Sequence, residues 1–200
     1  MIRYAITDSS RFSDPATRQT GLLSQAQRWA CQKIDFVQLR EKTLEAGELL
    51  TLAETMLAVF REHGGHTKLL INGRLDVAIA AKADGVHLTS QSDGLTPAHV
   101  RQLYAEAMLR EPVVSTSCHS IAEVERACSL GTNLILFGPV FEKRVDGLVI
   151  TAGVGLDMLR DACMVAGETS LLALGGVTEE RAAACVEAGV AGVAAIRLFE

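Results

Sequence analysis

The sequence lacks the features that would mark a secreted, membrane-spanning or nucleic-acid-binding protein. Its five cysteines are scattered and form no Cys-x-x-Cys pair, which predicts reduced thiols rather than a disulfide framework or a zinc site. No apolar run approaches the roughly 20 residues of a membrane-spanning helix. The N-terminal stretch does not resemble a signal peptide, because Asp8 interrupts its short apolar run. The net charge of −5 argues against a nucleic-acid partner, since such proteins usually carry a basic surface.

Two further absences concern bound cofactors and phosphate-binding turns. No carboxylates stand at the spacing of metal ligands, so we expect neither a metal nor another cofactor. The first predicted strand is followed by Asp8-Ser9-Ser10 rather than by a glycine-rich phosphate turn. What the chain does have is apolar content, because 48% of its 200 residues are hydrophobic, which is enough for a sizeable core. We expect a single domain over residues 1–200, in a cytoplasmic protein.

Short apolar runs alternate with amphipathic segments along the whole chain. Strands are predicted for residues 2–7, 34–41, 68–72, 85–88, 113–117, 134–138, 170–174 and 192–196. Helices are predicted for residues 19–33, 44–62, 75–81, 97–108, 120–129, 156–165 and 178–188. A polar loop is predicted for residues 141–151.

Eight strands that alternate with seven helices predict a parallel α/β fold, and this count favours a (βα)8 TIM barrel. An open doubly wound sheet is the alternative, which the missing glycine-rich turn disfavours. The barrel would lack its last outer helix, so the outer faces of the first and last strands would have no cover. Another subunit or a missing segment would supply one, and we expect a homo-oligomer such as a dimer.

The stretch 34–42 begins as an apolar strand and ends in a run of charge. Because side chains alternate between the two faces of a strand, one face carries Val37 and Leu39, and the other carries Phe36, Gln38, Arg40 and Lys42. If the first face packs on helices, the other face lines the barrel interior, where unpaired polar groups are costly. We therefore expect Gln38, Arg40 and Lys42 to bind a polar, anionic ligand. The alternative for Arg40 is a structural ion pair with Glu41 or with a neighbouring strand.

Other strands also end in polar residues or glycines. Ligands bind at the carboxyl ends of barrel strands, so these residues predict one site at one face. The predicted substrate-binding residues on the later strands are Asn72, Ser117 and Gly138. Gly175-Gly176 and the backbone at Ile196-Arg197 stand where barrels often hold phosphate through backbone N–H groups. The alternative for the two glycines is a plain turn.

His119 is the candidate acid/base. It precedes Ser120-Ile-Ala-Glu123, which predicts a capping box at the start of a helix. The positive end of the helix dipole favours a neutral imidazole that can take up a proton at neutral pH. The alternative is an ordinary loop histidine. His87 lies within a strand and is interpreted as a satisfied core histidine.

Eight short motifs follow one another over nearly the whole chain. They are Tyr4-Ala-Ile-Thr-Asp8, Val37-Gln-Leu-Arg-Glu-Lys42, Leu70-Ile-Asn-Gly-Arg74, Ala83-Asp-Gly-Val-His-Leu88, Ser117-Cys-His-Ser120, Phe137-Gly-Pro-Val-Phe141, Ala173-Leu-Gly-Gly-Val177 and Ala191-Gly-Val-Ala194. Each is weak alone, but the ordered set resembles the thiamine phosphate synthase/TenI family. The resemblance implies a (βα)8 barrel of thiamine biosynthesis and a small-molecule thiazole phosphate substrate.

The family has two branches, and the chain departs from one of them. Synthases couple a pyrimidine diphosphate to a thiazole phosphate with the help of Mg²⁺. Their two metal-ligand aspartates correspond to Gly73 and Ser92 here, with Asp93 one place late, and the lysine that grips the diphosphate corresponds to Asp146. Without these hard oxygen ligands there is little reason to expect Mg²⁺. The same departures resemble the TenI branch, which includes thiazole tautomerases.

The resemblance therefore implies a thiazole tautomerase, which aromatises a carboxythiazole phosphate by moving a proton and needs no metal. His119 would act as the acid and base, and Arg40 would pair with the substrate carboxylate. One alternative is a Mg²⁺-dependent synthase that uses Asp93 and either Lys143 or Arg144 as shifted substitutes. Another is a regulatory protein that binds thiazole or thiamine phosphates without turnover.

Overall fold

The computed structural model describes the chain except residues 13, 15–16, 90–93, 146–147 and 200, and the side chains of residues 143–148. In the described part, eight parallel strands close into a barrel in the order β1-β10-β9-β6-β5-β4-β3-β2. These strands are β1 (Ile2–Ile6), β2 (Phe36–Leu39), β3 (Lys68–Asn72), β4 (Gly85–Leu88), β5 (Val113–Cys118), β6 (Leu134–Phe137), β9 (Ser170–Leu174) and β10 (Gly192–Ala195). The predicted TIM barrel is confirmed.

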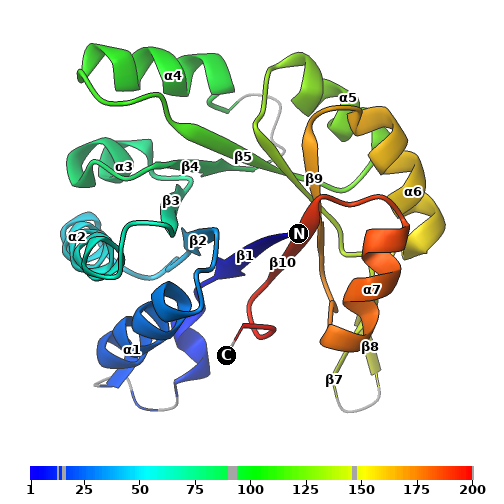
Figure 1. Ribbon diagram of the computed structural model, residues 1–200, viewed down its shortest axis with the longest axis horizontal. Helices are drawn as coiled ribbons and strands as arrows, with labels where there is room; N and C mark the ends of the chain where they lie inside the picture. The colour runs from blue at the N-terminus through cyan, green and yellow to red at the C-terminus, as the bar shows by residue number, and fades with distance from the viewer. Residues whose placement is uncertain (13, 15–16, 90–93, 146–147, 200) are drawn as a thin grey trace.

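Helices surround the strands on the outside (Figure 1). They are α1 (Arg18–Cys31), α2 (Ala46–Glu62), α3 (Leu75–Ala81), α4 (Pro97–Glu106), α5 (Ile121–Ser129), α6 (Gly155–Ala166) and α7 (Glu179–Glu187), with a short 3-10 helix η1 (Ser9–Arg11) after β1. The predicted helices and strands all occur, and their ends differ from the prediction by at most two residues. None of the helices in the described part is long and apolar enough to cross a membrane.

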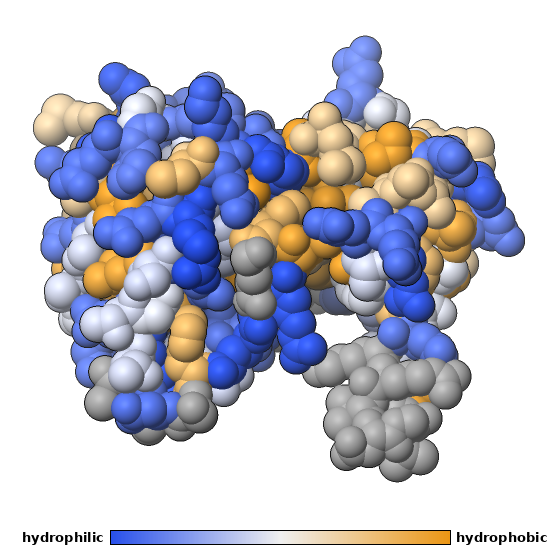
Figure 2. Space-filling model, turned by 60° about the horizontal axis from the view of Figure 1, so that its bottom comes forward, coloured by the Kyte–Doolittle hydropathy of each residue, from blue (hydrophilic) through white to orange (hydrophobic). Residues whose placement is uncertain are grey.

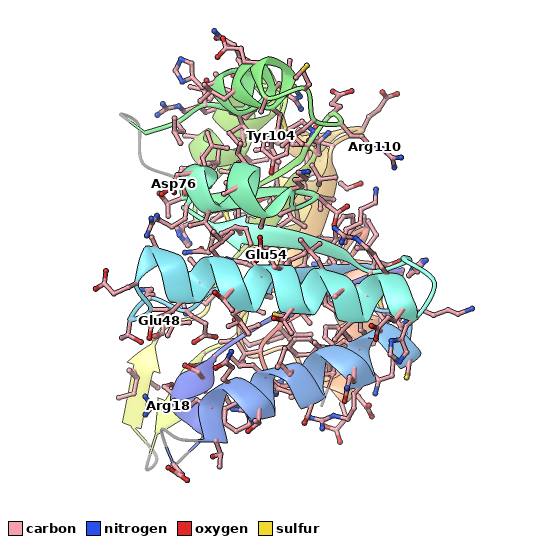
Figure 3. The ribbon with its side chains drawn as sticks, turned by 90° about the vertical axis from the view of Figure 1, so that its left-hand side faces the viewer. Arg18, Glu48, Glu54, Asp76, Tyr104 and Arg110 are labelled. Carbon is pink, nitrogen blue, oxygen red and sulfur yellow. The ribbon has the colours of Figure 1, made fainter. Side chains whose placement is uncertain are left out.

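One prediction was wrong. The segment predicted as a polar loop, residues 141–151, contains the antiparallel strands β7 (Lys143–Val145) and β8 (Leu148–Thr151). The charges at Lys143 and Arg144 concealed a segment rich in β-branched residues, which favour strands. This hairpin lies at the end of the molecule where α2 begins (Figure 3), on the side of the barrel where α7 lies and away from α1 (Figure 1).

The two faces of β2 confirm the predicted alternation. Val37 and Leu39 are fully buried in the outer cluster, which also contains the α2 residues Leu52 and Met56. On the inner face, the ring of Phe36 stacks on that of Tyr4 from β1, with a centroid distance of 6.0 Å. The polar side chains of this strand therefore point into the barrel, as the sequence predicts.

Among the described residues, no helix follows β10. The residues after β10 partly fill the space between α1 and α7. Phe199 packs against the outer clusters, and its carbonyl oxygen accepts a hydrogen bond from Trp29 Nε1 at 2.8 Å. A hollow of about 380 Å³ remains beside Leu198 and Phe199. Figure 2 shows apolar and hydrophilic surface side by side on this face. Association through it stays a prediction.

Candidate active site

The carboxyl ends of the barrel strands meet at one end of the molecule, which we call the barrel mouth. In Figure 3 the residues Arg18, Glu48 and Asp76, which all follow strand ends along the chain, lie at this end, whereas Arg110 lies at the opposite end. Parallel register places the polar residues of neighbouring strands at the same height. Asn72 pairs with His87, and His87 pairs with Ser115.

A chain of side-chain hydrogen bonds runs across the barrel interior near the mouth, from β3 to β5. Gln38 Nε2 donates to Asn72 Oδ1 at 2.8 Å, and the Tyr4 hydroxyl donates to Gln38 Oε1 at 3.3 Å. Tyr4 Oη lies 3.1 Å from Ser115 Oγ. His87 completes the chain, with Nδ1 2.9 Å from Ser115 Oγ and Nε2 2.9 Å from Ser117 Oγ. We call this set the polar chain.

Burial keeps the two titratable members of the polar chain uncharged. The pKa of His87 is lowered to about 3, first because burial disfavours the imidazolium and second because Arg40 is positively charged. Burial also raises the pKa of the Tyr4 phenol, which therefore keeps its proton. A neutral histidine and a protonated phenol can each donate one hydrogen bond through their N–H or O–H.

Arg40 does not form the ion pair with Glu41 that the sequence left open. The buried Glu41 carboxylate instead accepts from the backbone N–H of Ser9, at 3.2 and 3.3 Å. The backbone N–H of Arg40 donates to Thr7 Oγ1 at 2.9 Å, which fixes the end of β2 against β1. The half-buried Arg40 guanidinium has no carboxylate within ion-pair distance among the described residues. A cation in this state is suited to an anionic ligand.

Both the imidazole ring and the backbone N–H of His119 form hydrogen bonds. Its Nδ1 lies 2.5 Å from the carbonyl oxygen of Gly138, and because a carbonyl only accepts, Nδ1 carries the hydrogen. Its backbone N–H donates to Glu123 Oε2 at 2.5 Å. Ser120 Oγ accepts from the backbone N–H of Glu123 as predicted, but the Glu123 carboxylate reaches back to His119 rather than to Ser120. In the neutral ring, Nε2 is therefore left with a free lone pair.

Gly175 and Gly176 follow β9 with φ angles of +95° and +65°. A Cβ at Gly175 would lie 2.6 Å from Pro139 Cα, and one at Gly176 would lie 2.8 Å from Phe141 Cβ. The close approach of the segment after β6 thus requires glycine here. Phosphate binding by these residues stays a prediction, since the packing alone accounts for both glycines.

The remaining predicted residues are less closely tied to the site. Ile196 packs against the inner cluster of the barrel, whereas Lys42 and Arg197 are exposed. In the described part of the chain, no hydrogen bond or ion pair joins the Lys42 or Arg197 side chain to another predicted site residue. Ser92, Asp93 and Asp146 lie outside the described residues, as do the side chains of Lys143 and Arg144.

The described residues contain no group of three or more His, Cys, Asp or Glu side chains placed to hold a metal ion. Gly73, which stands where synthases carry a ligand aspartate, has a φ of +67°. A Cβ there would meet no atom within 4 Å. Space would therefore allow a side chain at this position, and glycine suits the backbone conformation.

Three residues of the polar chain were not singled out as site residues from the sequence. His87 is buried and hydrogen-bonded, which confirms the interpretation as a satisfied core histidine, but it also touches the predicted site residue Ser117. Tyr4 and Ser115 link it to Gln38. The two-residue period of each strand was the signal that could have found them, since all face the barrel interior.

Fold and site together define a TIM barrel with a polar mouth suited to a small anionic ligand. The sequence model of the family described as "Thiamine monophosphate synthase" matches residues 3–199. The chain belongs to this family, designated TMP-TENI. The assignment to the TenI-like branch stays a prediction.

Relatives from several organisms match most of the chain. A protein of Aquifex aeolicus named "Putative thiamine-phosphate synthase 2" is 31% identical over 196 residues, which cover 98% of this chain and 96% of the relative. A protein of Neisseria meningitidis named "Thiamine-phosphate synthase" is 39% identical over 163 residues, which cover 82% of this chain and 75% of the relative. The solved structure of a thiamine phosphate pyrophosphorylase from Pyrococcus furiosus superimposes with a TM-score of 0.76 at 24% identity, covering 98% of this chain and 85% of that one, and supports the fold.

Proposed function

We propose that this chain is a thiazole tautomerase of thiamine biosynthesis. It converts a carboxythiazole phosphate tautomer into the aromatic thiazole by taking a proton from a ring carbon and returning one to the exocyclic carbon. No bond to phosphate or carboxylate changes in this reaction, so the chemistry asks for an acid/base and for anchors on the two anionic groups.

The observation that carries this proposal is the setting of His119. The Gly138 carbonyl fixes the hydrogen on Nδ1, so the free Nε2 can accept the ring proton. The protonated ring can then return a proton to the exocyclic carbon. Because His119 is exposed, the proton it carries can exchange with water.

Two groups are available as anchors for the anionic ends of this substrate. The guanidinium of Arg40, without an ion pair in the described part of the chain, suits a carboxylate in a planar, bidentate contact. The backbone N–H groups at Gly175-Gly176 and at Ile196-Arg197 suit a phosphate. His119 would act between the two, because β5, which it follows, lies between β2 and β9 in the order of the barrel strands. Its partner Gly138 packs against the carbonyl of Leu174, directly before Gly175.

The second candidate function is a thiamine phosphate synthase. The names of relatives with up to 39% identity favour it. Against it stands Gly73, where synthases have an aspartate that holds Mg²⁺. If Mg²⁺ binds, Asp93 and the Lys143-Arg144 pair are the groups that would hold it and the diphosphate. A protein that binds the same phosphates without turnover is the third possibility.

One pair of incubations separates the three candidates. The protein is given the thiazole tautomer in one reaction, and the pyrimidine diphosphate, the thiazole phosphate and Mg²⁺ in the other. A tautomerase forms the aromatic thiazole in the first reaction, with deuterium on the exocyclic carbon when the solvent is D₂O. Thiamine phosphate in the second reaction would instead establish the synthase, and tight binding without either product would establish the binding protein.

A further inference from the structure

The polar chain has a direction, which follows from the number of hydrogens each member can donate. The Gln38 amide nitrogen donates to Asn72, so its oxygen is left to accept from the Tyr4 hydroxyl. Tyr4 has one hydrogen, and that hydrogen is used on Gln38. The contact of 3.1 Å between Tyr4 and Ser115 therefore needs Ser115 as its donor.

The same counting continues to the mouth. Ser115 donates its only hydroxyl hydrogen to Tyr4. Its Oγ, 2.9 Å from Nδ1 of His87, must therefore accept the Nδ1–H hydrogen. His87 is 3% exposed and neutral, so its ring carries one hydrogen. Because that hydrogen is on Nδ1, Nε2 is unprotonated. Nε2 must then accept from the hydroxyl of Ser117, 2.9 Å away. After this step, Ser117 has no hydrogen left to donate.

We infer that His87 is a positioning residue that makes Ser117 an acceptor-only hydroxyl, so that the ligand places a hydrogen-bond donor against Ser117. Ser117 is half-buried on the inner face of β5, at the end of the chain of bonds nearest the mouth. A donor such as an N–H, or the polarised ring C–H of the proposed substrate, fits there, whereas a carboxylate or phosphate oxygen would meet only lone pairs. The anionic groups of the ligand are thereby directed away from Ser117, toward Arg40 and the glycines.

The reversed direction is also chemically consistent, and electrostatics decides between the two. If both amides, Gln38 and Asn72, were turned over, every hydrogen would point the other way and Nε2 of His87 would carry the hydrogen. Arg40 acts on His87 with its positive charge. A cation near the mouth attracts lone pairs and repels hydrogens. It therefore favours the direction in which His87 carries its hydrogen on Nδ1 and the lone pairs of the polar chain point toward the mouth.

The direct test is the tautomer of His87 in the wild-type protein, and it uses no substrate. Two-bond 1H–15N correlation spectra of protein with 15N-labelled histidine distinguish protonated from bare ring nitrogens. We expect one histidine with a protonated Nδ1 and a bare Nε2 that does not change between pH 5 and pH 8. Its signal is assigned by its absence in His87→Gln, or by this lack of titration if that variant does not fold. A protonated Nε2, or an imidazolium, would overturn the inference.

A matched pair of variants tests the consequence for binding, which rests on the proposed function. His87→Gln can place its amide oxygen near the position of Nε2 and still accept from Ser117. His87→Asn reaches only toward Ser115 and frees the Ser117 hydrogen. We expect KM for the carboxythiazole phosphate to rise about tenfold in His87→Asn and about threefold or less in His87→Gln, at similar melting temperatures.

Equal KM values in the two variants would contradict the positioning role of His87. If the wild-type protein turns over no carboxythiazole phosphate, the proposed function fails, while the tautomer measurement still decides the direction of the polar chain. The two failures are therefore distinguishable.

Discussion

On the β1–β5 side of the barrel mouth, the groups available to a ligand are side-chain atoms, whereas on the β6–β9 side they are backbone atoms. The first side holds Gln38, Asn72 and Ser117 through the buried polar chain, next to the Arg40 cation. The second side presents the Gly138 carbonyl and the glycine pair after β9. The first side, which we call the side-chain half, can thus select a ligand by charge and hydrogen-bond direction. The second side, the backbone half, offers amides and carbonyls at fixed places among its described residues.

The largest effect is expected when the cation is removed from the side-chain half. Arg40→Gln should raise KM for the carboxythiazole phosphate about 10- to 100-fold, because a charge-assisted contact is worth about 1.5–3 kcal/mol. The matched control is Lys42→Gln, two positions further along the chain in the turn after β2, where the exposed ammonium should matter about threefold or less. Steady-state kinetics of both variants checks this. Equal effects would mean that Arg40 does not hold the anion.

Next in size is the effect of a methyl group in the backbone half. Gly175→Ala should lower the free energy of unfolding by about 2 kcal/mol more than Gly64→Ala. The two glycines have almost the same φ, +95° and +93°, but only Gly175 has an atom within 2.6 Å of the added carbon. Urea unfolding measures the difference. Similar losses in the two variants would show that packing against Pro139 does not require the glycine.

The side-chain half should also make stability depend on pH. The pKa of His87 is about 3 in the folded protein and 6.5 in its ordinary state, so between these values the unfolded chain binds the extra proton. The resulting stability is fully present above pH 6.5 and falls as the pH drops, by about 2 kcal/mol at pH 5. Urea unfolding at pH 5 and pH 7.5 should show this loss in the wild type and a smaller one in His87→Gln. Parallel profiles would contradict the neutral, buried His87.

The smallest expected effect concerns one hydroxyl of the polar chain. Tyr4→Phe removes the group between Gln38 and Ser115 and leaves both without that partner, so it should cost about 1–2 kcal/mol. Tyr104→Phe is the control, because that buried hydroxyl makes one bond, to the Ala83 carbonyl at 3.2 Å. We expect Tyr4→Phe to cost about 1 kcal/mol more. Equal unfolding free energies would mean that the polar chain adds nothing beyond a single bond.

The same division decides what could be predicted from the sequence. The barrel, the inward face of Gln38 and Arg40, and the position of His119 before a helix followed from period, spacing and capping residues. The sequence could not show that the Glu123 carboxylate would reach His119, because a capping box would use the same carboxylate on the neighbouring Ser120 N–H. Nor could it join Tyr4 to Ser115, which are far apart in the chain and meet only when the barrel closes.

The hairpin was missed for a different reason. Its charged first strand hides the β-branched second strand, although the Asp146-Gly147 dipeptide between them is a sequence signal for a two-residue hairpin turn and could have found it. The glycine pair was located correctly, but spacing could not tell a phosphate cradle from a packing requirement. The structure supplies the packing requirement, through Pro139 and Phe141.

The central claim is that His119 transfers the proton, and the rate of aromatisation of the carboxythiazole phosphate by His119→Ala tests it most directly. His63→Ala is the matched control, because His63 is exposed and its Nδ1 also lies close to a backbone carbonyl, 2.8 Å from Val59 O. With EDTA present throughout, the account predicts wild-type turnover for His63→Ala and a kcat about 10²- to 10⁴-fold lower for His119→Ala. A wild-type kcat in His119→Ala would contradict it.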